Sequence, residues 1–237
     1  MSTSAQRPDG RQLRWDKHNQ ERRQVILDAA IAVVEASEPG SDYHVQQIAE
    51  QAGLNRSVVY RHFTDRADLD HAILAEIVEG VMERLLPSLT LDGTVREIIH
   101  RIVFSYVDWA AEHPALHRLV DRAPIGGALE QGLDRVAAVI VEVLETAIEM
   151  LGMDLDEDDA ASIDPLAYAL VGAAFSAVRR WVAREPRRPA AAELALVLSD
   201  SVWLILDGHA RRLGVTIDPD LPIEELLNIP DPEVAQG

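Results

Sequence analysis

The sequence lacks cysteine and long hydrophobic runs. Without cysteine there is no disulfide framework and no thiolate metal site, which is typical of proteins of a reducing compartment. The longest apolar run, residues 166–178, is shorter than the roughly 20 residues that span a bilayer. The polar N-terminal segment contains no stretch typical of a signal peptide. We therefore expect a cytoplasmic protein that does not cross a membrane.

Familiar catalytic and cofactor motifs are also missing. The sequence has no Gly-x-Ser-x-Gly, Gly-x-Gly-x-x-Gly or phosphate-loop pattern, which argues against an enzyme. His113 and His117 have the spacing of two metal ligands on one helix face, but the glutamate of the His-Glu-x-x-His motif and an assured third ligand are missing. The aspartates at 154, 156 and 158 resemble the start of a calcium loop without its glycine and final glutamate, so a solvated loop is expected there. The sequence predicts no cofactor and no metal site.

Alternating β-branched runs are missing too, whereas apolar spacings of three and four residues recur throughout. This pattern predicts an all-α fold of nine helices. Two short helices lie within residues 44–66. The other seven are expected at about 19–37, 66–86, 94–112, 114–122, 129–151, 165–184 and 190–213.

Charge is unevenly distributed along the chain. The net charge is −18, yet residues 1–66 contain nine basic and nine acidic residues, so the whole excess of negative charge follows residue 66. Residues 1–24 contain six basic and three acidic residues. A basic front on an acidic body would orient the molecule toward a polyanion. Charge alone does not separate this interpretation from a solvated tail.

The stretch HVQQIAEQAGLNRSVVYRHFTDR, residues 44–66, contains two short helical patterns that meet at Gly53. The first has a narrow apolar stripe at Val45, Ile48, Ala49 and Ala52. Glycine suits the left-handed backbone that ends a helix, and Asn55 can cap the next helix through its side-chain oxygen. Helix, short glycine turn and helix together predict a helix-turn-helix.

The second helix of this motif has two different faces. Val59 and Phe63 point inward, whereas Ser57, Tyr60 and Arg61 share a polar face. Burying that face in protein would leave polar groups unpaired, while a DNA major groove offers phosphates and base edges. The alternative is an ordinary surface helix. The residues predicted to contact DNA are Arg56, Ser57, Val58, Tyr60, Arg61, His62 and Arg66.

The run IAEQAGLNRSVVYRHF, with a helix before it and a charged start to a long helix after it, resembles the DNA-binding domain of TetR-family transcriptional regulators over about residues 20–75. The resemblance implies that residues 56–58 and 60–62 face the operator. It also implies a small core of Ile48, Ala49, Leu54, Val59 and Phe63. Ser57 and Val58 replace the more usual Gly and Thr, and Arg66 replaces a common Lys, so no base preference is carried over. Because His44 stands where a Thr cap is common, Ser41 or Asp42 is expected to cap instead.

The resemblance also implies how the chain is divided. We expect a basic, flexible arm over residues 1–18, which either follows the minor groove or has no role. The DNA-binding domain is expected over 19–66, a helical effector-binding and dimerisation domain over 67–216, and a loosely attached tail over 217–237.

The larger domain is expected to hold a ligand cavity and a dimer interface. The candidate cavity residues are His100, Phe104, Tyr106, Trp109, Leu116, His117, Val120, Ile140, Leu144, Phe175, Val178 and Trp181, although any of them suits a plain core as well. The candidate interface residues, from two helices that would form a symmetric four-helix bundle, are Gly172, Ala173, Ala177, Leu196, Trp203 and Leu206.

Together with the resemblance, these features predict a homodimeric repressor that binds double-stranded DNA at a palindromic operator. The resemblance further implies release by a small-molecule effector, expected to be largely apolar, which favours the state that does not bind DNA. Two alternatives remain at this point. One is a DNA-binding regulator without an effector, and the other is a small-molecule or lipid carrier whose helix-turn-helix is vestigial.

Overall fold

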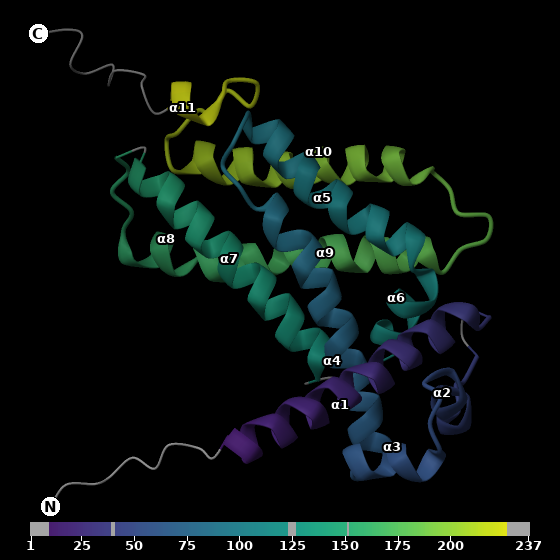
Figure 1. The fold of residues 1–237 in the computed structure, drawn as a ribbon. Coiled ribbons are helices and arrows are strands. Elements are labelled where there is room, and N and C mark those ends of the chain that lie inside the picture. The colour runs from purple at the N-terminus through teal and green to yellow at the C-terminus, as the bar shows by residue number, and fades with distance from the viewer. Residues whose placement is uncertain (1–9, 39–40, 123–126, 151, 227–237) are drawn as a thin grey trace, which may run out of the picture. The chain divides into compact units, whose positions relative to one another are not determined.

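The computed structural model describes residues 10–38, 41–122, 127–150 and 152–226, and within these ranges the chain is helical, without a strand (Figure 1). This confirms the predicted all-α class. The helices of the described residues are α1 (Gly10–Ala36), α2 (Val45–Gln51), α3 (Arg56–His62), α4 (Arg66–Leu85), the 3-10 turn η1 (Leu86–Ser88), α5 (Val95–Glu112), α6 (Pro114–Asp121), α7 (Ala128–Met150), α8 (Glu157–Ala161), α9 (Ile163–Val182), α10 (Ala191–Arg212) and α11 (Ile223–Leu226).

Each of the nine predicted helices has a counterpart, and two short helices, α8 and α11, were not predicted. Helix α8 lies in the stretch expected to be a solvated acidic loop. The Asp156 side chain accepts a hydrogen bond of 2.8 Å from the Asp159 amide and so caps this helix. Carboxylates in the first turn also suit the positive end of the helix dipole. The acidic composition therefore starts a helix here.

The segment after α10 is attached more firmly than predicted. The Arg96 amide donates to the Pro219 carbonyl at 3.2 Å, and the Ile223 amide donates to the Gly93 carbonyl at 3.0 Å. These bonds tie the segment that leads into α11 to the start of α5. The prediction of a loose tail was therefore wrong for residues 217–226, and residues 227–237 lie outside the described ranges.

Helix α1 begins at Gly10, nine residues earlier than predicted. The predicted flexible arm was therefore wrong for residues 10–18, while residues 1–9 lie outside the described ranges. After Pro8 the sequence contains no proline until Pro39 and is rich in Arg, Gln and Glu, which favour helix. Lys17 and Glu21 also form an exposed ion pair one turn apart, at 3.9 Å.

The chain forms two compact units, residues 1–77 and 78–237, and the division falls inside α4. The sequence placed a domain boundary at residues 66/67, where α4 begins. The first turns of α4 instead belong to the N-terminal unit, because Leu69 and Ile73 are fully buried side chains of its core. The other fully buried side chains of this core come from α1, α2, α3 and the residue after α3: Ile26, Ile48, Val59 and Phe63.

In the larger unit, α5 packs against α10, and α7 packs against α9. The stretch Glu157–Val182, which includes α9, is long and apolar enough to cross a membrane by length and composition alone. Core helices of water-soluble proteins pass the same test. Ile163, Leu166 and Leu170 on α9 line a cavity inside this unit, described below.

Candidate nucleic-acid interface and effector cavity

The turn between α2 and α3 has the geometry that its sequence predicts. Gly53 has φ +65°, in the left-handed region where a side chain would be strained. The Gly53 amide donates to the Glu50 carbonyl at 3.1 Å, and the Leu54 amide donates to the Ala49 carbonyl at 2.8 Å. These two bonds satisfy the last carbonyl groups of α2, as a helix-ending glycine usually does.

The predicted side-chain caps of the motif are not formed. His44 is the N-cap of α2, and its amide donates to the Gln47 side chain at 2.7 Å, so neither Ser41 nor Asp42 caps this helix. Asn55 occupies the N-cap position of α3 with an extended backbone, but its side chain makes no cap hydrogen bond. The motif depends on its backbone turn and on core packing, and less on side-chain caps.

The faces of α3 divide as the spacing predicts. Val59 and Phe63 are buried, at 0% and 1% exposure. Arg56, Ser57 and Arg61 are exposed, while Val58, Tyr60 and His62 are partly exposed. The Arg56 guanidinium carbon lies 5.5 Å from the Tyr60 ring centroid, and its Nη2 is 3.5 Å from the Tyr60 hydroxyl. This surface presents donors to solvent.

Helix α1 adds cations beside the end of α3, which the sequence did not predict. Burial lowers the pKa of His62, and the neighbouring charges of Arg22, Arg61 and Arg23 lower it further. Arg23 also donates to the His62 carbonyl at 2.9 Å and lies 4.2 Å from the centroid of the Phe63 ring. Arg23 therefore fastens α1 to α3, whereas Arg22 adds positive charge near the predicted DNA-contacting face.

The Arg66 side chain is held by hydrogen bonds and a cation–π contact within its own unit. Its Nε donates to Asp70 at 2.6 Å, its Nη2 donates to the Tyr43 carbonyl at 3.2 Å, and its guanidinium covers the Tyr43 ring at 4.5 Å. The Tyr43 hydroxyl donates to the same Asp70 at 2.6 Å. Arg66 therefore connects α4 to the segment before α2, and its predicted contact with DNA stays a prediction.

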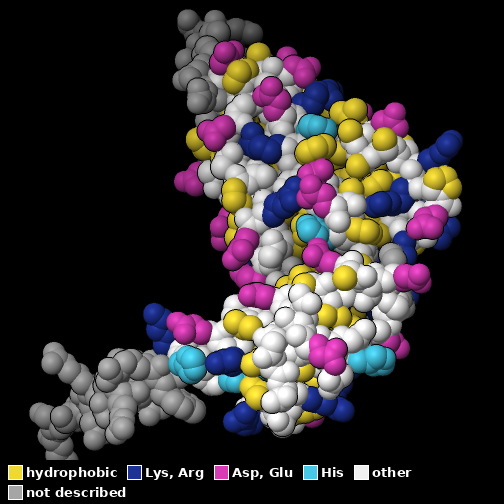
Figure 2. Space-filling model, turned by 45° about the vertical axis from the view of Figure 1, so that its right-hand side comes forward, with side chains coloured by type: hydrophobic (Ala, Val, Ile, Leu, Met, Phe, Trp, Pro, Cys, Tyr) yellow, Lys and Arg dark blue, Asp and Glu magenta, His cyan; other side chains and the backbone are white. Residues whose placement is uncertain are grey.

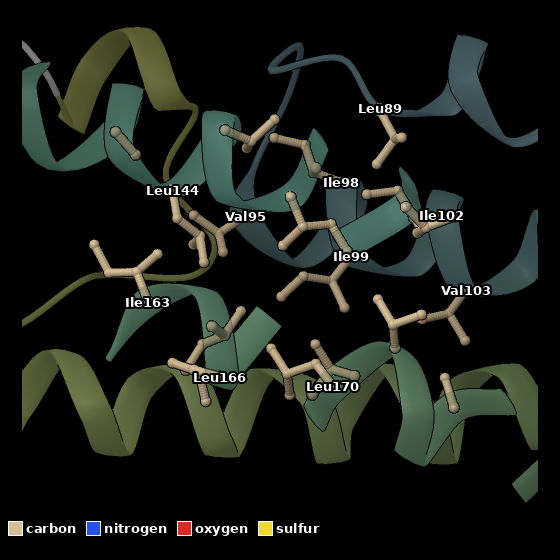
Figure 3. Close-up of a pocket in the computed structure, with 18 of the residues that line it drawn as sticks. Leu89, Val95, Ile98, Ile99, Ile102, Val103, Leu144, Ile163, Leu166 and Leu170 are labelled. Carbon is tan, nitrogen blue, oxygen red and sulfur yellow. The ribbon is translucent and has the colours of Figure 1, made fainter. Parts of the chain in front are cut away.

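The larger unit contains a cavity of about 880 Å³. Aliphatic side chains of α5, α7 and α9 converge on it, together with Leu89 from the loop after η1 (Figure 3). Helix α4 contributes residues from Val78 to Leu85, and α10 contributes residues from Val202 to Arg212. A volume of this size is in the range of pockets that hold drug-sized ligands.

Seven of the twelve predicted cavity residues are in the lining, namely Tyr106, Trp109, His117, Val120, Ile140, Leu144 and Phe175. The other five predictions, His100, Phe104, Leu116, Val178 and Trp181, were wrong as cavity residues. Leu116, Val178 and Trp181 are core residues at 5%, 0% and 5% exposure, and Phe104 is 38% exposed. Helical spacing identified apolar positions but did not separate a filled core from a cavity wall.

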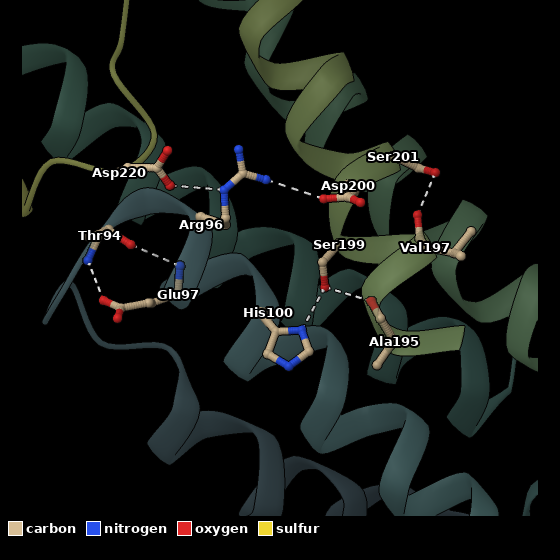
Figure 4. A network of polar contacts seen from close by, with 10 residues as sticks. All are labelled: Thr94, Arg96, Glu97, His100, Ala195, Val197, Ser199, Asp200, Ser201 and Asp220. Carbon is tan, nitrogen blue, oxygen red and sulfur yellow. Dashed lines mark hydrogen bonds and ion pairs between the residues drawn. The ribbon is translucent and has the colours of Figure 1, made fainter. Parts of the chain in front are cut away.

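His100 faces α10 and not the cavity. Its Nδ1 lies 3.3 Å from the Ser199 hydroxyl, and that hydroxyl donates to the Ala195 carbonyl at 2.7 Å (Figure 4). One turn earlier on α5, Arg96 joins Asp200 at 3.2 Å and Asp220 at 3.0 Å. These polar contacts hold α10 and the following segment to α5.

Much of the lining was not predicted individually. Leu89, the aliphatic residues of α5 and the first half of α9 contribute most of what Figure 3 labels: Leu89, Val95, Ile98, Ile99, Ile102, Val103, Ile163, Leu166 and Leu170. The sequence did indicate that α5 contributes to the lining, because this helix has apolar residues on more than one face. Which of those faces meets a cavity depends on the helices packed around it.

One pair of polar groups lies in the buried wall of the cavity. The Tyr106 hydroxyl is 2.9 Å from His117 Nε2, and the His117 ring stacks on Phe175 with centroids 5.5 Å apart. Burial lowers the pKa of His117 to about 4, and burial together with nearby Asp121 raises the pKa of Tyr106. Both side chains are therefore uncharged at neutral pH.

The predicted interface residues divide between surface and interior. Leu196 is 55% exposed, Ala173 is exposed, and Gly172 and Ala177 are partly exposed. Trp203 is only 9% exposed, Leu206 is partly exposed, and both line the cavity, so their place in a dimer interface stays a prediction. The exposed large hydrophobic side chains of α10 are Leu196, Val197, Leu204 and Ile205. Figure 2 shows hydrophobic side chains gathered among charged ones on one face of this unit.

Comparison with known proteins places the helix-turn-helix in a family. Residues 26–73 match the family of bacterial regulatory proteins named tetR. A helix-turn-helix transcriptional regulator of Mycobacterium tuberculosis is 26% identical over 210 residues, which cover 87% of this chain and 86% of that protein. The nucleoid occlusion factor SlmA of a Marinomonas species is 25% identical over 169 residues, which cover 70% of this chain and 85% of that protein.

Solved structures share the fold along most of the chain. A tetR-family transcriptional regulator from Streptomyces coelicolor has a TM-score of 0.62 at 20% identity, with 88% of this chain and 87% of that chain covered. The regulator FadR of Bacillus subtilis, solved with stearoyl-CoA, has a TM-score of 0.58 at 17% identity, with 76% and 96% covered. Together with the helix-turn-helix geometry, these comparisons show a DNA-binding domain of the TetR family at residues 26–73, in a chain that shares the fold of TetR-family transcriptional regulators.

Proposed function

We propose that this regulator is a homodimeric repressor that holds a palindromic operator and releases it when an apolar small molecule fills the cavity. The observation that carries the DNA-binding part is the exposed face of α3, where Arg56, Ser57 and Arg61 present donors to solvent. A groove of DNA supplies phosphate and base acceptors, which suit these donors better than the long contact of 3.5 Å between Arg56 and the Tyr60 hydroxyl. Such a protein would act in the cytoplasm, where bacterial DNA lies.

Each residue on that face has a contact suited to its chemistry. Arg56 and Arg61 can each donate two hydrogen bonds to a guanine or pair with a phosphate. Tyr60 and His62 suit phosphate oxygens, and the partly exposed Val58 suits a thymine methyl group. Arg22 on α1 joins this set, because its charge already influences His62.

Dimerisation is supported by the exposed apolar side chains of α10. Leu196, Val197, Leu204 and Ile205 are between 42% and 67% exposed. Their positions repeat two turns apart on one side of the helix. A two-fold axis through such a face would double the base contacts, with half-sites about one DNA turn apart.

Helix α4 supports a coupling between ligand and DNA. Its first half places Leu69 and Ile73 in the core of the N-terminal unit, and its second half places Met82 and Leu85 in the cavity wall. A ligand that binds more tightly to one position of the second half therefore biases the first half, to which the helix-turn-helix is packed. The effector must prefer the state that does not bind DNA, because equal affinity for both states would shift nothing.

An apolar effector is supported by the lining of the cavity and by one relative. The side chains labelled in Figure 3 are all aliphatic. The FadR structure with stearoyl-CoA shows that a protein of this fold binds a long acyl chain. The functional division that we propose is a DNA-binding domain that ends near α4 and an effector and dimerisation domain after it.

Selection of bound sequences from random DNA tests the proposal. We expect a palindrome with half-sites about one helical turn apart, and release of that DNA by a subset of apolar compounds. Recovery of no preferred sequence, together with compound binding, would favour the carrier function. A palindrome that no cavity-binding compound releases would refute the effector role and leave DNA binding intact.

A further inference from the structure

We propose that the cavity takes an uncharged ligand with an extended apolar body and one hydrogen-bonding group, which meets the Tyr106–His117 pair in the cavity wall. This inference rests on the proposed effector role of the cavity and narrows the chemistry of the effector. It follows from three features of the wall: its lack of unpaired charge, the neutrality of the buried polar pair, and the sign of the charge at the rim.

Permanent charge is almost missing from the wall. Among the described residues that line the cavity, only Asp159 and Arg212 have permanently charged side chains, and these two pair with each other at 2.8 Å. An ion placed among aliphatic side chains loses its hydration and finds no counter-ion, which is costly. The body of a ligand that fills this space is therefore uncharged.

The buried polar pair is neutral and can serve either hydrogen-bonding role. His117 is 2% exposed, and burial keeps its imidazole unprotonated at neutral pH. The charges that act on it from α6 and α9 partly cancel, because Asp121 favours the protonated ring while Arg118 and Arg179 oppose it. If the imidazole donates to the Tyr106 oxygen, the tyrosine hydroxyl is left to donate to a ligand carbonyl. If the tyrosine donates to the imidazole, its oxygen accepts from a ligand hydroxyl.

The rim of the cavity is acidic. The side chains of Arg212 and Asp159 are 57% and 27% exposed, so the cavity reaches solvent at this point. Gly152, Met153 and Leu155 also line it. Exposed carboxylates alternate with them and continue into α8, at positions 154, 156, 157 and 158. Negative potential at the rim disfavours an anionic head group that would remain outside while its chain entered.

Four probes that share one alkyl chain test the inference. Dodecanol, dodecanoate, dodecanoyl-CoA and dodecyltrimethylammonium are titrated into the full-length protein. Dodecanol is kept below its solubility limit, and the three ionic probes are kept below their critical micelle concentrations. Tryptophan fluorescence reports binding, because Trp109 and Trp203 line the cavity. We expect dodecanol to bind at least about tenfold more tightly than each charged probe, with an affinity that does not change between pH 6.5 and 8.

A matched pair of variants locates the hydrogen bond. Tyr106→Phe is expected to weaken dodecanol binding about fivefold, the usual size of one neutral hydrogen bond. Tyr168→Phe makes the same chemical change at a side chain that is 40% exposed and outside the lining, and is expected to leave binding unchanged. Thermal unfolding of both variants confirms that they are folded.

The outcomes separate the inference from the effector role. A charged probe that binds as tightly as dodecanol would overturn the inference while leaving the cavity an effector site. Equal affinities for dodecanol in the Tyr106→Phe and Tyr168→Phe variants would remove Tyr106 from the site. If none of the four probes changes the fluorescence of protein that binds its selected DNA, the effector role fails together with the inference.

Discussion

The two units of the chain differ in how tightly their interiors are packed and in whether their exposed arginines pair with acidic side chains. In the N-terminal unit the largest core side chains, including Phe63, Ile26 and Ile48, are at most 1% exposed, while Arg56 and Arg61 face solvent without an acidic partner among the described residues. In the larger unit, arginines such as Arg84, Arg96 and Arg135 pair with acidic side chains, and the interior contains a cavity of about 880 Å³.

This contrast follows from what each unit has to bind. A DNA groove is a rigid polyanion outside the protein. The N-terminal unit therefore needs a filled core that fixes the position of α3, and arginines on α3 that no carboxylate of the protein neutralises. A small molecule must instead be enclosed, so the larger unit gives up packing in its interior. If this contrast holds, changes in core packing, buried titratable groups, surface charge and cavity volume have different consequences in the two units.

The same truncation in each unit gives the largest expected difference. Phe63→Ala removes a side chain that is 1% exposed in a filled core and is expected to destabilise the N-terminal unit by about 3–5 kcal/mol. Phe175→Ala removes a ring that already borders the cavity, and we expect a cost of about 2 kcal/mol or less in the larger unit. Hydrogen exchange measured with increasing denaturant gives a separate free energy of unfolding for each unit. Equal losses of this free energy in the two variants would contradict the difference in packing between the units.

Acid is expected to destabilise the larger unit through His117. The pKa of this side chain is lowered from 6.5 to about 4 in the folded protein. Between these values the unfolded chain binds the proton more readily, so stability falls as pH decreases below 6.5, by up to about 3 kcal/mol at pH 4. Urea unfolding of the native protein and of His117→Gln, measured across this pH range, isolates the effect. His71→Gln, at an exposed position of the N-terminal unit, is the control.

Loss of the two exposed arginines of α3 is expected to weaken operator binding without unfolding the protein. The Arg56→Ala, Arg61→Ala double variant should lose about a hundredfold in affinity. Because the dimer loses four arginines, the slope of log affinity against log salt should decrease by up to about 4. Fluorescence anisotropy of labelled DNA measures both quantities. Arg180→Ala, Arg184→Ala removes two exposed arginines of the larger unit and should change neither. Equal behaviour of the two double variants would exclude α3 as the reading surface.

Added volume in the cavity is expected to have the smallest effect on stability. Leu170→Phe places a larger side chain at a position that lines the cavity, so we expect a change of less than about 1 kcal/mol in unfolding. Overpacking of a filled core usually costs about 1–3 kcal/mol. The variant should nevertheless bind dodecanol more weakly, as tryptophan fluorescence can show. A large destabilisation would indicate that the space closes in solution.

Local sequence was enough to predict the helix-turn-helix. Gly53 marks the turn because a left-handed backbone conformation depends on a single residue. Val59 and Phe63 mark the inner face because residues four positions apart lie on the same side of a helix. The contacts of Arg66 inside the protein could not be predicted, for the opposite reason. Its partners Tyr43 and Asp70 come from two segments, and only folding brings them together.

The early start of α1 shows a similar limit. Residues 10–18 were read as a flexible arm because they are polar and basic, yet the same residue types favour helix when a stable helix follows them. Sequence alone did not show that the extension of α1 would bring His18 close to His62.

The order of residues by itself determined the helical class, the reading motif and the apolar character of the larger unit, since each depends on periodicity within a few turns. Tertiary structure decided which apolar positions surround empty space and which are packed, as the contrast between Phe175 and Val178 on the same helix shows. A cavity is a property of several helices at once. Its walls are chemically the same as a core, and only the distance between the helices separates the two.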